Sequence, residues 1–302
     1  MKIQIPEQLK AEAPQTTMGK LLLVTPVVMT VIATLLAGLA SSEMTRAQYN
    51  RAYAAQLQSK AGDQWNYFQA KKLRSAIQRN SIDLLGATAE IRPLEAAVIL
   101  KVDPAASAET VAALTAAKLP AVPAAGEADP TVKAAAEAVE LAKPEEEIAV
   151  VMNALPESTL ASALKAARDH AGAFDAATKP VNDAIEKLEK LFARNFAASD
   201  RATVRDFTAA RVSFAAARYD AEARLNQAIA SLLELQVRKT NLAAERHHRR
   251  SGRFFLGMLA AQAAVVVSTF SLAAQKRNLL WIVAAVAGIV AIAFAIYVYL
   301  YV

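Results

Sequence analysis

The sequence predicts an all-α membrane protein with three transmembrane helices, of which one is N-terminal and two form a C-terminal hairpin. Between them we expect a long antiparallel helical stalk. Three apolar segments, 21–40, 254–274 and 279–302, contain no Asp, Glu, Lys or Arg, and each can cross about 30 Å of hydrocarbon as a helix. Alanine, the strongest helix former, makes up roughly a quarter of the chain. No segment has the alternating, β-branched pattern of a strand.

The composition excludes several kinds of chemistry. The 302 residues include 0 Cys, so the chain has no disulfide, no thiolate metal site and no thiol nucleophile. The sequence contains no Gly-rich phosphate loop, no His/Glu metal spacing and no nucleophile motif. We therefore expect no catalytic residue, no cofactor and no metal site, and we expect that the protein is not an enzyme.

The N-terminal part combines a polar tail, residues 1–20, with the first apolar segment. Small residues at the end of that segment suit signal peptidase, so a cleaved signal peptide is one alternative. The long polar leader and the length of the apolar run favour a retained transmembrane helix. Thr30, Thr34 and Gly38 recur every four residues, and such a stripe of small side chains lets another helix approach closely.

Residues 41–102 are predicted to form the first stalk element, a long polar helix followed, after a proline, by a short apolar piece. A cap at Ser42 and a helix continuous with the first span are both compatible with the sequence. The most distinctive part is Asp63-Gln64-Trp65, in which Trp65 shares a face with Phe68. We interpret this face as packing against the long C-terminal helix around Arg218–Leu232, where Trp65→Ala would cost about 3–5 kcal/mol if the ring is buried. The alternative is an aromatic cluster that binds a ligand.

Residues 103–155 are rich in Ala, Pro and Glu and contain few large apolar side chains, so they can bury little surface. We expect a loosely packed excursion at the distal tip of the stalk. Within it, residues 107–118 and 131–142 are each predicted to form a short helix.

Residues 156–253 are predicted to return to the membrane. Pro156 begins a helix that ends at Gly172, Pro180 begins a second helix, and residues 201–250 form one long helix. Apolar residues recur every seven positions along the long helix, a spacing that suits close packing between antiparallel helices. The predicted stalk-packing residues are Trp65, Phe68, Phe207, Phe214, Leu225, Leu232 and Leu235.

Charged and aromatic residues flank the apolar segments, where we expect them to contact lipid headgroups and to set topology. The basic cluster lacks aromatic interleaving and any known module, so no nucleic-acid partner is expected. His247 and His248 are adjacent and point about 100° apart on a helix, so they do not share a metal ion. The predicted membrane-interface residues are Arg246, His247, His248, Arg249, Arg250, Arg253, Lys276, Arg277, Trp281, Tyr297 and Tyr299.

Three segments carry a resemblance to a known family. Asp63-Gln64-Trp65 and Lys71 follow the first span, Arg246–Arg250 precedes a span, and a basic turn leads into Trp281. This order resembles an uncharacterised bacterial family of three-span membrane proteins, domain of unknown function 4337. The resemblance covers roughly the first 90 and the last 70 residues, and the Ala/Pro-rich middle is longer than the family pattern needs. It implies a multi-pass protein of the bacterial inner membrane and brings no activity.

The expected function is structural: a membrane protein that presents the stalk as a scaffold or assembly platform and self-associates. Small residues every four positions in the second span, Ala260, Ala264 and Ser268, support self-association. The alternative is an accessory subunit of a transport or other membrane complex, because a carrier on its own needs ionisable groups within the bilayer and the spans offer only Gln262 and hydroxyls. The expected partners are membrane lipid and either a second copy or another membrane protein.

Overall fold

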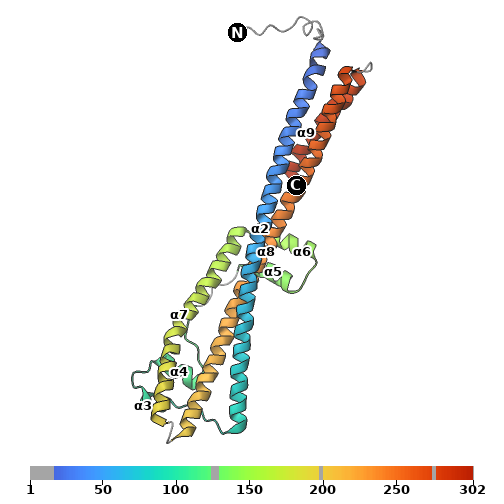
Figure 1. Ribbon diagram of the computed structural model, residues 1–302. Helices are drawn as coiled ribbons and strands as arrows, with labels where there is room; N and C mark the ends of the chain where they lie inside the picture. The colour runs from blue at the N-terminus through green and yellow to red at the C-terminus, as the bar shows by residue number, and fades with distance from the viewer. Residues whose placement is uncertain (1–16, 124–128, 197–199, 274–276, 302) are drawn as a thin grey trace, which may run out of the picture. The chain divides into compact units, whose positions relative to one another are not determined.

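The computed structural model describes residues 17–123, 129–196, 200–273 and 277–301, and within these ranges every regular element is an α-helix (Figure 1). The prediction of an all-α protein is confirmed. In chain order the helices are α2 (Thr17–Thr88), α3 (Ala96–Val102), α4 (Ala108–Ala116), α5 (Pro130–Glu140), α6 (Glu145–Ala154), α7 (Glu157–Phe196), α8 (Arg201–Ala273) and α9 (Arg277–Tyr301).

The chain divides into two units, and each is described by itself. The first unit, Met1–Tyr53 with Thr240–Val302, is the apolar unit; the second, Ala54–Lys239, is the polar unit. Helices α2 and α8 contribute residues to both, whereas α9 belongs to the apolar unit and α3 to α7 belong to the polar unit.

Three helices of the apolar unit are long and apolar enough to cross a membrane. The qualifying segments lie in α2, in α8 and in α9, where the sequence predicted them. These findings indicate a membrane protein with three candidate spans. Of the two alternatives at Ser42, the structure has the continuous helix: α2 and α8 run without interruption from the apolar into the polar sequence, so no cap at Ser42 starts a new helix.

Small side chains face inward between the three apolar helices. Gly257 lies where a Cβ would be 3.4 Å from the Cδ1 of Leu36, and a Cβ at Gly288 would overlap the side chain of Met29. Large apolar side chains point outward instead, as in Val27, which is 63% exposed. In soluble proteins, large apolar side chains usually point inward. The opposite arrangement is expected for helices surrounded by lipid, which associate through close packing of small residues because the hydrophobic effect does not drive them together. The buried cluster here consists of Ala33, Leu36, Ala40, Phe254, Ala261, Ala291 and Val298.

Helix α7 overturns the prediction of two helices separated between Gly172 and Pro180. It is one helix from Glu157 to Phe196 with Pro180 in its interior. The reason is that its apolar face continues across both breakers at alternating spacings of three and four residues, so tertiary burial outweighs the local cost of Gly and Pro. Buried residues on this face are Leu160, Leu164, Phe174, Thr178, Val181, Ile185, Leu188 and Phe192.

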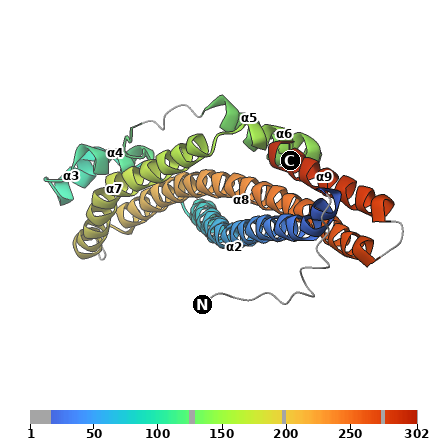
Figure 2. The same cartoon turned by 90° about the horizontal axis from the view of Figure 1, so that it is seen from above.

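The two short helices predicted within residues 103–155 are present as α4 and α5, and α6 follows them. Ser107 caps α4 by accepting a hydrogen bond from the backbone N–H of Thr110, and Asp129 caps α5 in the same way through Thr131. The prediction of a loosely packed segment is wrong, because its helices dock at different places: α4, with the preceding α3, packs against α7, whereas α5 and α6 pack chiefly against each other (Figure 2).

Helix α6 is held to α8 by two basic residues at the end of the polar unit. Arg238 pairs with Glu145 at 3.2 Å, and the Lys239 ammonium donates hydrogen bonds to the carbonyls of Met152 and Leu155. The last carbonyls of a helix carry partial negative charge, so a lysine there stabilises the helix end. The α5–α6 pair therefore docks on α8 at Arg238 and Lys239.

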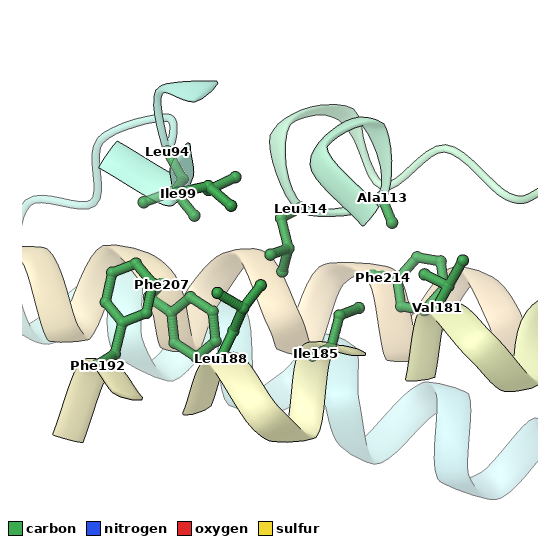
Figure 3. Packing of buried hydrophobic residues seen from close by; sticks show 10 residues of the cluster. All are labelled: Leu94, Ile99, Ala113, Leu114, Val181, Ile185, Leu188, Phe192, Phe207 and Phe214. Carbon is green, nitrogen blue, oxygen red and sulfur yellow. The ribbon is translucent and has the colours of Figure 1, made fainter. Parts of the chain in front are cut away.

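The main core of the polar unit lies where α3 and α4 cover α7 and α8 (Figure 3). Phe192 and Phe207 stack with their ring centroids 4.2 Å apart and their planes 13° from parallel. Leu94, Ile99 and Leu114 complete the cluster from the covering segments. The few large apolar residues of this region are therefore concentrated in one place, which is why a segment poor in such residues still folds.

We expect Phe207→Ala to lower the free energy of unfolding by about 3–5 kcal/mol, because a buried, stacked ring is replaced by a cavity. Urea or guanidinium unfolding followed by circular dichroism measures the change. Leu84→Ala in α2 is the matched control, since Leu84 is 67% exposed and should change stability by no more than about 0.5 kcal/mol. Equal losses in the two variants would contradict the core shown in Figure 3.

Candidate functional site

Two rows of small side chains, together called the alanine seam, line the facing sides of α2 and α8. Members of each row recur at multiples of seven residues, and all of them are buried. The α2 row consists of Ala33, Ala40, Ala47, Ala54, Ala61 and Ser75. The α8 row consists of Ala209, Ala216, Ala223, Ala230, Ala244 and Ser251. A seven-residue repeat keeps one helix face against its partner over many turns.

Two serines show how closely the backbones approach at the seam. In the polar unit, the Ser75 hydroxyl donates to the carbonyl of Ala216 at 2.9 Å. In the apolar unit, the Ser251 hydroxyl donates to the carbonyl of Ala40 at 2.7 Å. A side chain as short as serine reaches the backbone of another helix only when the two helices nearly touch. In both bonds the partner is a member of the opposite row, so each unit by itself uses the same pairing.

Trp65 contacts α8 slightly beyond the predicted range. Its indole N–H donates to the Glu234 carboxylate at 3.0 Å, and its ring meets Phe68 edge-on with centroids 5.5 Å apart. Trp65 is only half-buried. The full burial assumed for a loss of about 3–5 kcal/mol is therefore absent, and a smaller cost follows.

Lysines that follow Trp65 form ion pairs along the seam. Lys71 pairs with Glu222, and Lys72 pairs with Asp220 at 2.6 Å. As the residue number of the lysine on α2 increases, the residue number of its partner on α8 decreases. Tyr219 lies beside these pairs, with the Arg218 guanidinium 4.5 Å from its ring centroid. Glu222 is buried and Asp220 is half-buried, and each pairs with two cations. This cluster therefore fixes the helices rather than offering a free acid or base.

Asp220 is the carboxyl group of this cluster whose titration is changed. The hydrogen bond from Lys72 lowers the pKa of Asp220 below its ordinary value of 3.8; partial burial opposes the shift, and the charges of Lys72 and Arg224 add to it. The pKa of Asp200, before α8, is lowered mainly by the hydroxyl of Thr203. Both carboxyl groups therefore favour the folded state more when ionised.

Several cavities lie in the described part of the polar unit. One of about 350 Å³ is lined by residues of α2, α7 and α8, including Gln78, Asn182 and Arg211, and Arg211 is paired with Glu189 at 3.3 Å. A larger one of about 920 Å³, beside α4 and α7, is lined mainly by Ala and Pro residues. Within the described ranges, no group of three or more His, Asp or Glu side chains is placed to hold a metal ion.

The predicted stalk-packing residues occupy two kinds of position. Phe207, Phe214 and Leu235 are buried, each 2% exposed or less. The other predicted positions are half-buried, namely Trp65, Phe68, Leu225 and Leu232. The prediction followed large side chains and missed the alanine seam two residues away. Alanine at every seventh position was the available signal, but it is weak in a chain so rich in alanine.

A buried carboxylate, missed in the sequence, lies where the apolar part of α2 ends. Glu43 is 9% exposed and contacts His247 Nδ1 at 2.6 Å and Arg46 at 3.3 Å. The second acid of this region, Glu245, pairs with Arg249 at 3.2 Å. His247 therefore contacts a carboxylate of α2. Its place in the basic cluster of the sequence could not reveal this contact.

The remaining predicted interface residues differ in how far they can be placed. Arg250 and Arg253 are half-buried, and His248 is exposed. The Trp281 indole N–H donates to the Thr25 hydroxyl at 2.9 Å, so this ring joins α9 to α2. Tyr297 is 49% exposed. Lys276 and the side chains of Arg277 and Tyr299 lie outside the described residues.

Comparison with known proteins identifies the family. Residues 20–185 match the profile described as Domain of unknown function (DUF4337). The chain belongs to the DUF4337 family. No curated protein and no solved structure matches it.

The DUF4337 match corrects the expected extent of the resemblance. It includes Asp63-Gln64-Trp65, as expected, but it continues through residues 103–155, which were thought to depart from the family pattern. It ends within α7, so α8 and α9, with the basic cluster, lie beyond the matched range. The ordered helices α3 to α6 are thus part of the DUF4337 region.

Asp220→Asn should reduce the dependence of stability on acid pH. Because the folded-state pKa is lowered, Asp220 contributes stability that is present above its unfolded pKa, near 3.9, and that is lost as pH falls through the folded value. Wild-type protein should therefore lose more stability than the variant between pH 6 and about pH 3. Asp169→Asn, at an exposed carboxylate with no ion pair in the described ranges, is the matched control for thermal unfolding. A wild-type pH profile in Asp220→Asn would contradict the Lys72 pairing.

Proposed function

We propose that this DUF4337 protein is a non-enzymatic, multi-pass protein of the bacterial inner membrane that presents an antiparallel helical stalk as a scaffold. Its partners are membrane lipid and a second copy of the chain. The observation that carries the proposal is the alanine seam, because the same rows of small side chains pair α2 with α8 within each unit, and neither helix has a break. A seam of that kind suits a rigid support more than a binding cleft.

The arrangement of charges supports a structural role. Lys71, Lys72 and Arg218 are engaged with carboxylates of α8, and Lys239 is engaged with carbonyls of α6. Ion pairs and helix-end contacts hold helices together but leave those groups unsuited to proton transfer. Reactive groups normally lie in a cleft with a strongly perturbed pKa, whereas the lowered pKa values here belong to paired or capping aspartates.

Self-association is favoured by an open stripe on the first apolar segment. Thr30, Thr34 and Gly38 are exposed, and a Cβ added at Gly38 would meet nothing within 4 Å. Among the small residues of α8 and α9, Ala264, Ser268 and Ala291 are already buried within the chain, whereas Ala260 is exposed. The Thr30 and Thr34 hydroxyls bond to carbonyls of their own helix, so the stripe presents small, satisfied groups to a neighbour.

Gly38→Leu should shift the detergent-purified protein from a multiple of the 32.2 kDa chain toward the monomer. The added side chain separates helices that pack through the stripe. Light scattering coupled to size exclusion measures the mass, with Val28→Leu, at an exposed position off the stripe, as control. A wild-type monomer would remove self-association from the proposal. A stoichiometric foreign protein that co-purifies would support the alternative of an accessory subunit.

The stalk is proposed to face the cytoplasm. Within about 20 residues of the apolar segments, the stalk side carries nine Lys and Arg residues and the other side five, and the positive-inside rule places the richer side in the cytoplasm. The nine are Arg46, Arg51, Lys60, Arg238, Lys239, Arg246, Arg249, Arg250 and Arg253; the five are Lys2, Lys10, Lys20, Lys276 and Arg277.

Single-cysteine labelling tests this orientation cleanly because the chain has 0 Cys. Ser158→Cys, at an exposed position of α7, should react with an impermeant maleimide only after spheroplasts are lysed. The lysed sample controls for reactivity of the site. Equal labelling of intact and lysed spheroplasts would place the stalk outside.

A further inference from the structure

Some arginines at the polar ends of the apolar helices form ion pairs with glutamates, and others do not. Residues 41–53 and 240–253 contain six arginines and two glutamates, a net charge of +4 with histidines neutral. We call the six arginines the basic collar: Arg46, Arg51, Arg246, Arg249, Arg250 and Arg253. Glu43 pairs with Arg46, and Glu245 pairs with Arg249 and, at 3.9 Å, with Arg51.

Two collar residues stand apart. In the described part of the chain, Arg250 and Arg253 take part in no ion pair, although both are half-buried. The Nε of Arg250 is inaccessible to solvent and has no hydrogen-bond partner there. A half-buried guanidinium without a counter-charge is costly, so an external anion would stabilise it.

The surroundings of this pair favour a lipid over a free anion. Arg250 and Arg253 are three residues apart on α8, so they project from one face of the helix. The exposed apolar side chain of Leu256, three residues after Arg253, follows on that side of the helix. Phosphate-binding groups beside an exposed apolar side chain match a headgroup with its acyl chains.

We propose that Arg250 and Arg253 form a binding site for the phosphate of an anionic phospholipid. Two planar guanidinium groups can each give a bidentate pair of hydrogen bonds to a phosphodiester. The collar's net charge of +4 disfavours a zwitterionic headgroup, whose ammonium would lie among arginines. The site rests on the proposed membrane insertion and adds the class of lipid that the protein selects.

Native mass spectrometry of the full chain in mild detergent tests the site, with dioleoyl phosphatidylglycerol and dioleoyl phosphatidylcholine as probes. Wild-type protein should bind phosphatidylglycerol at least about tenfold more tightly than phosphatidylcholine. In R250Q/R253Q, phosphatidylglycerol binding should weaken about thirtyfold, since each arginine near an anionic headgroup contributes about 1 kcal/mol, a factor of roughly five. R250K/R253K should bind with intermediate affinity, because it keeps the charges and loses the planar donors.

The matched control is R46Q/R249Q, which removes the same charge from collar arginines that already have glutamate partners. Its affinity for phosphatidylglycerol should fall less than about fivefold. An equal loss in both double variants would reduce the effect to overall charge and overturn the site. Protection from thermal unfolding by inorganic phosphate at the same concentrations as phosphatidylglycerol would identify a free-phosphate site instead. Equal binding of the two lipids by wild type would also overturn the proposal.

Alkaline carbonate extraction separates this inference from the proposed function. R250Q/R253Q should remain in the membrane pellet with wild-type helicity by circular dichroism, which attributes any loss of lipid binding to the site. Release of the wild-type protein by carbonate would overturn membrane insertion and the lipid site together. A wild-type protein that stays in the pellet but does not prefer phosphatidylglycerol would overturn the lipid site alone.

Discussion

Close approach of two helix backbones is the constraint on which the other contacts depend. Along the alanine seam the side chains are so small that serine hydroxyls reach carbonyls of the opposite helix, as Ser75 does with Ala216. Alanine is apolar enough to be buried in lipid and small enough to allow tight packing in water. The same interface therefore serves α2 and α8 in both kinds of sequence, and neither helix needs to break where the apolar segment ends.

An alanine interface has a weakness that the flanking polar groups correct. A slip of seven residues would still place alanine against alanine, so the seam alone defines its register poorly. The Lys72–Asp220 pair and the Trp65–Glu234 hydrogen bond exist in one register only. Ser251 and the Glu43–His247 contact play the same part in the apolar unit. Charged pairs contribute little net stability in general but strongly disfavour wrong arrangements, and these contacts fit that role.

Local sequence patterns predicted well where individual helices begin. They predicted poorly whether a helix continues through a glycine or a proline. Ser107 and the Asp129-Pro130 pair are helix-start signals that act within a few residues, and helices begin at both. Gly172 and Pro180 are equally strong stop signals, yet α7 continues through them. Its apolar face, buried against distant parts of the chain, outweighs the local cost. Similarly, the docking of α6 through Lys239 joins residues 84 positions apart, which no local pattern encodes.

The sequence by itself determined the helical class, the three apolar segments and the candidate membrane-facing charges, because these depend on composition and on periodicity within one segment. It also pointed to the DUF4337 family through short motifs. Only the tertiary structure decided which alanines form the seam, that Glu43 meets His247, and that Arg250 and Arg253 have no acidic partner among the described residues. Those outcomes depend on the pairing of helices about 200 residues apart, and in an alanine-rich chain many pairings satisfy the local pattern equally well.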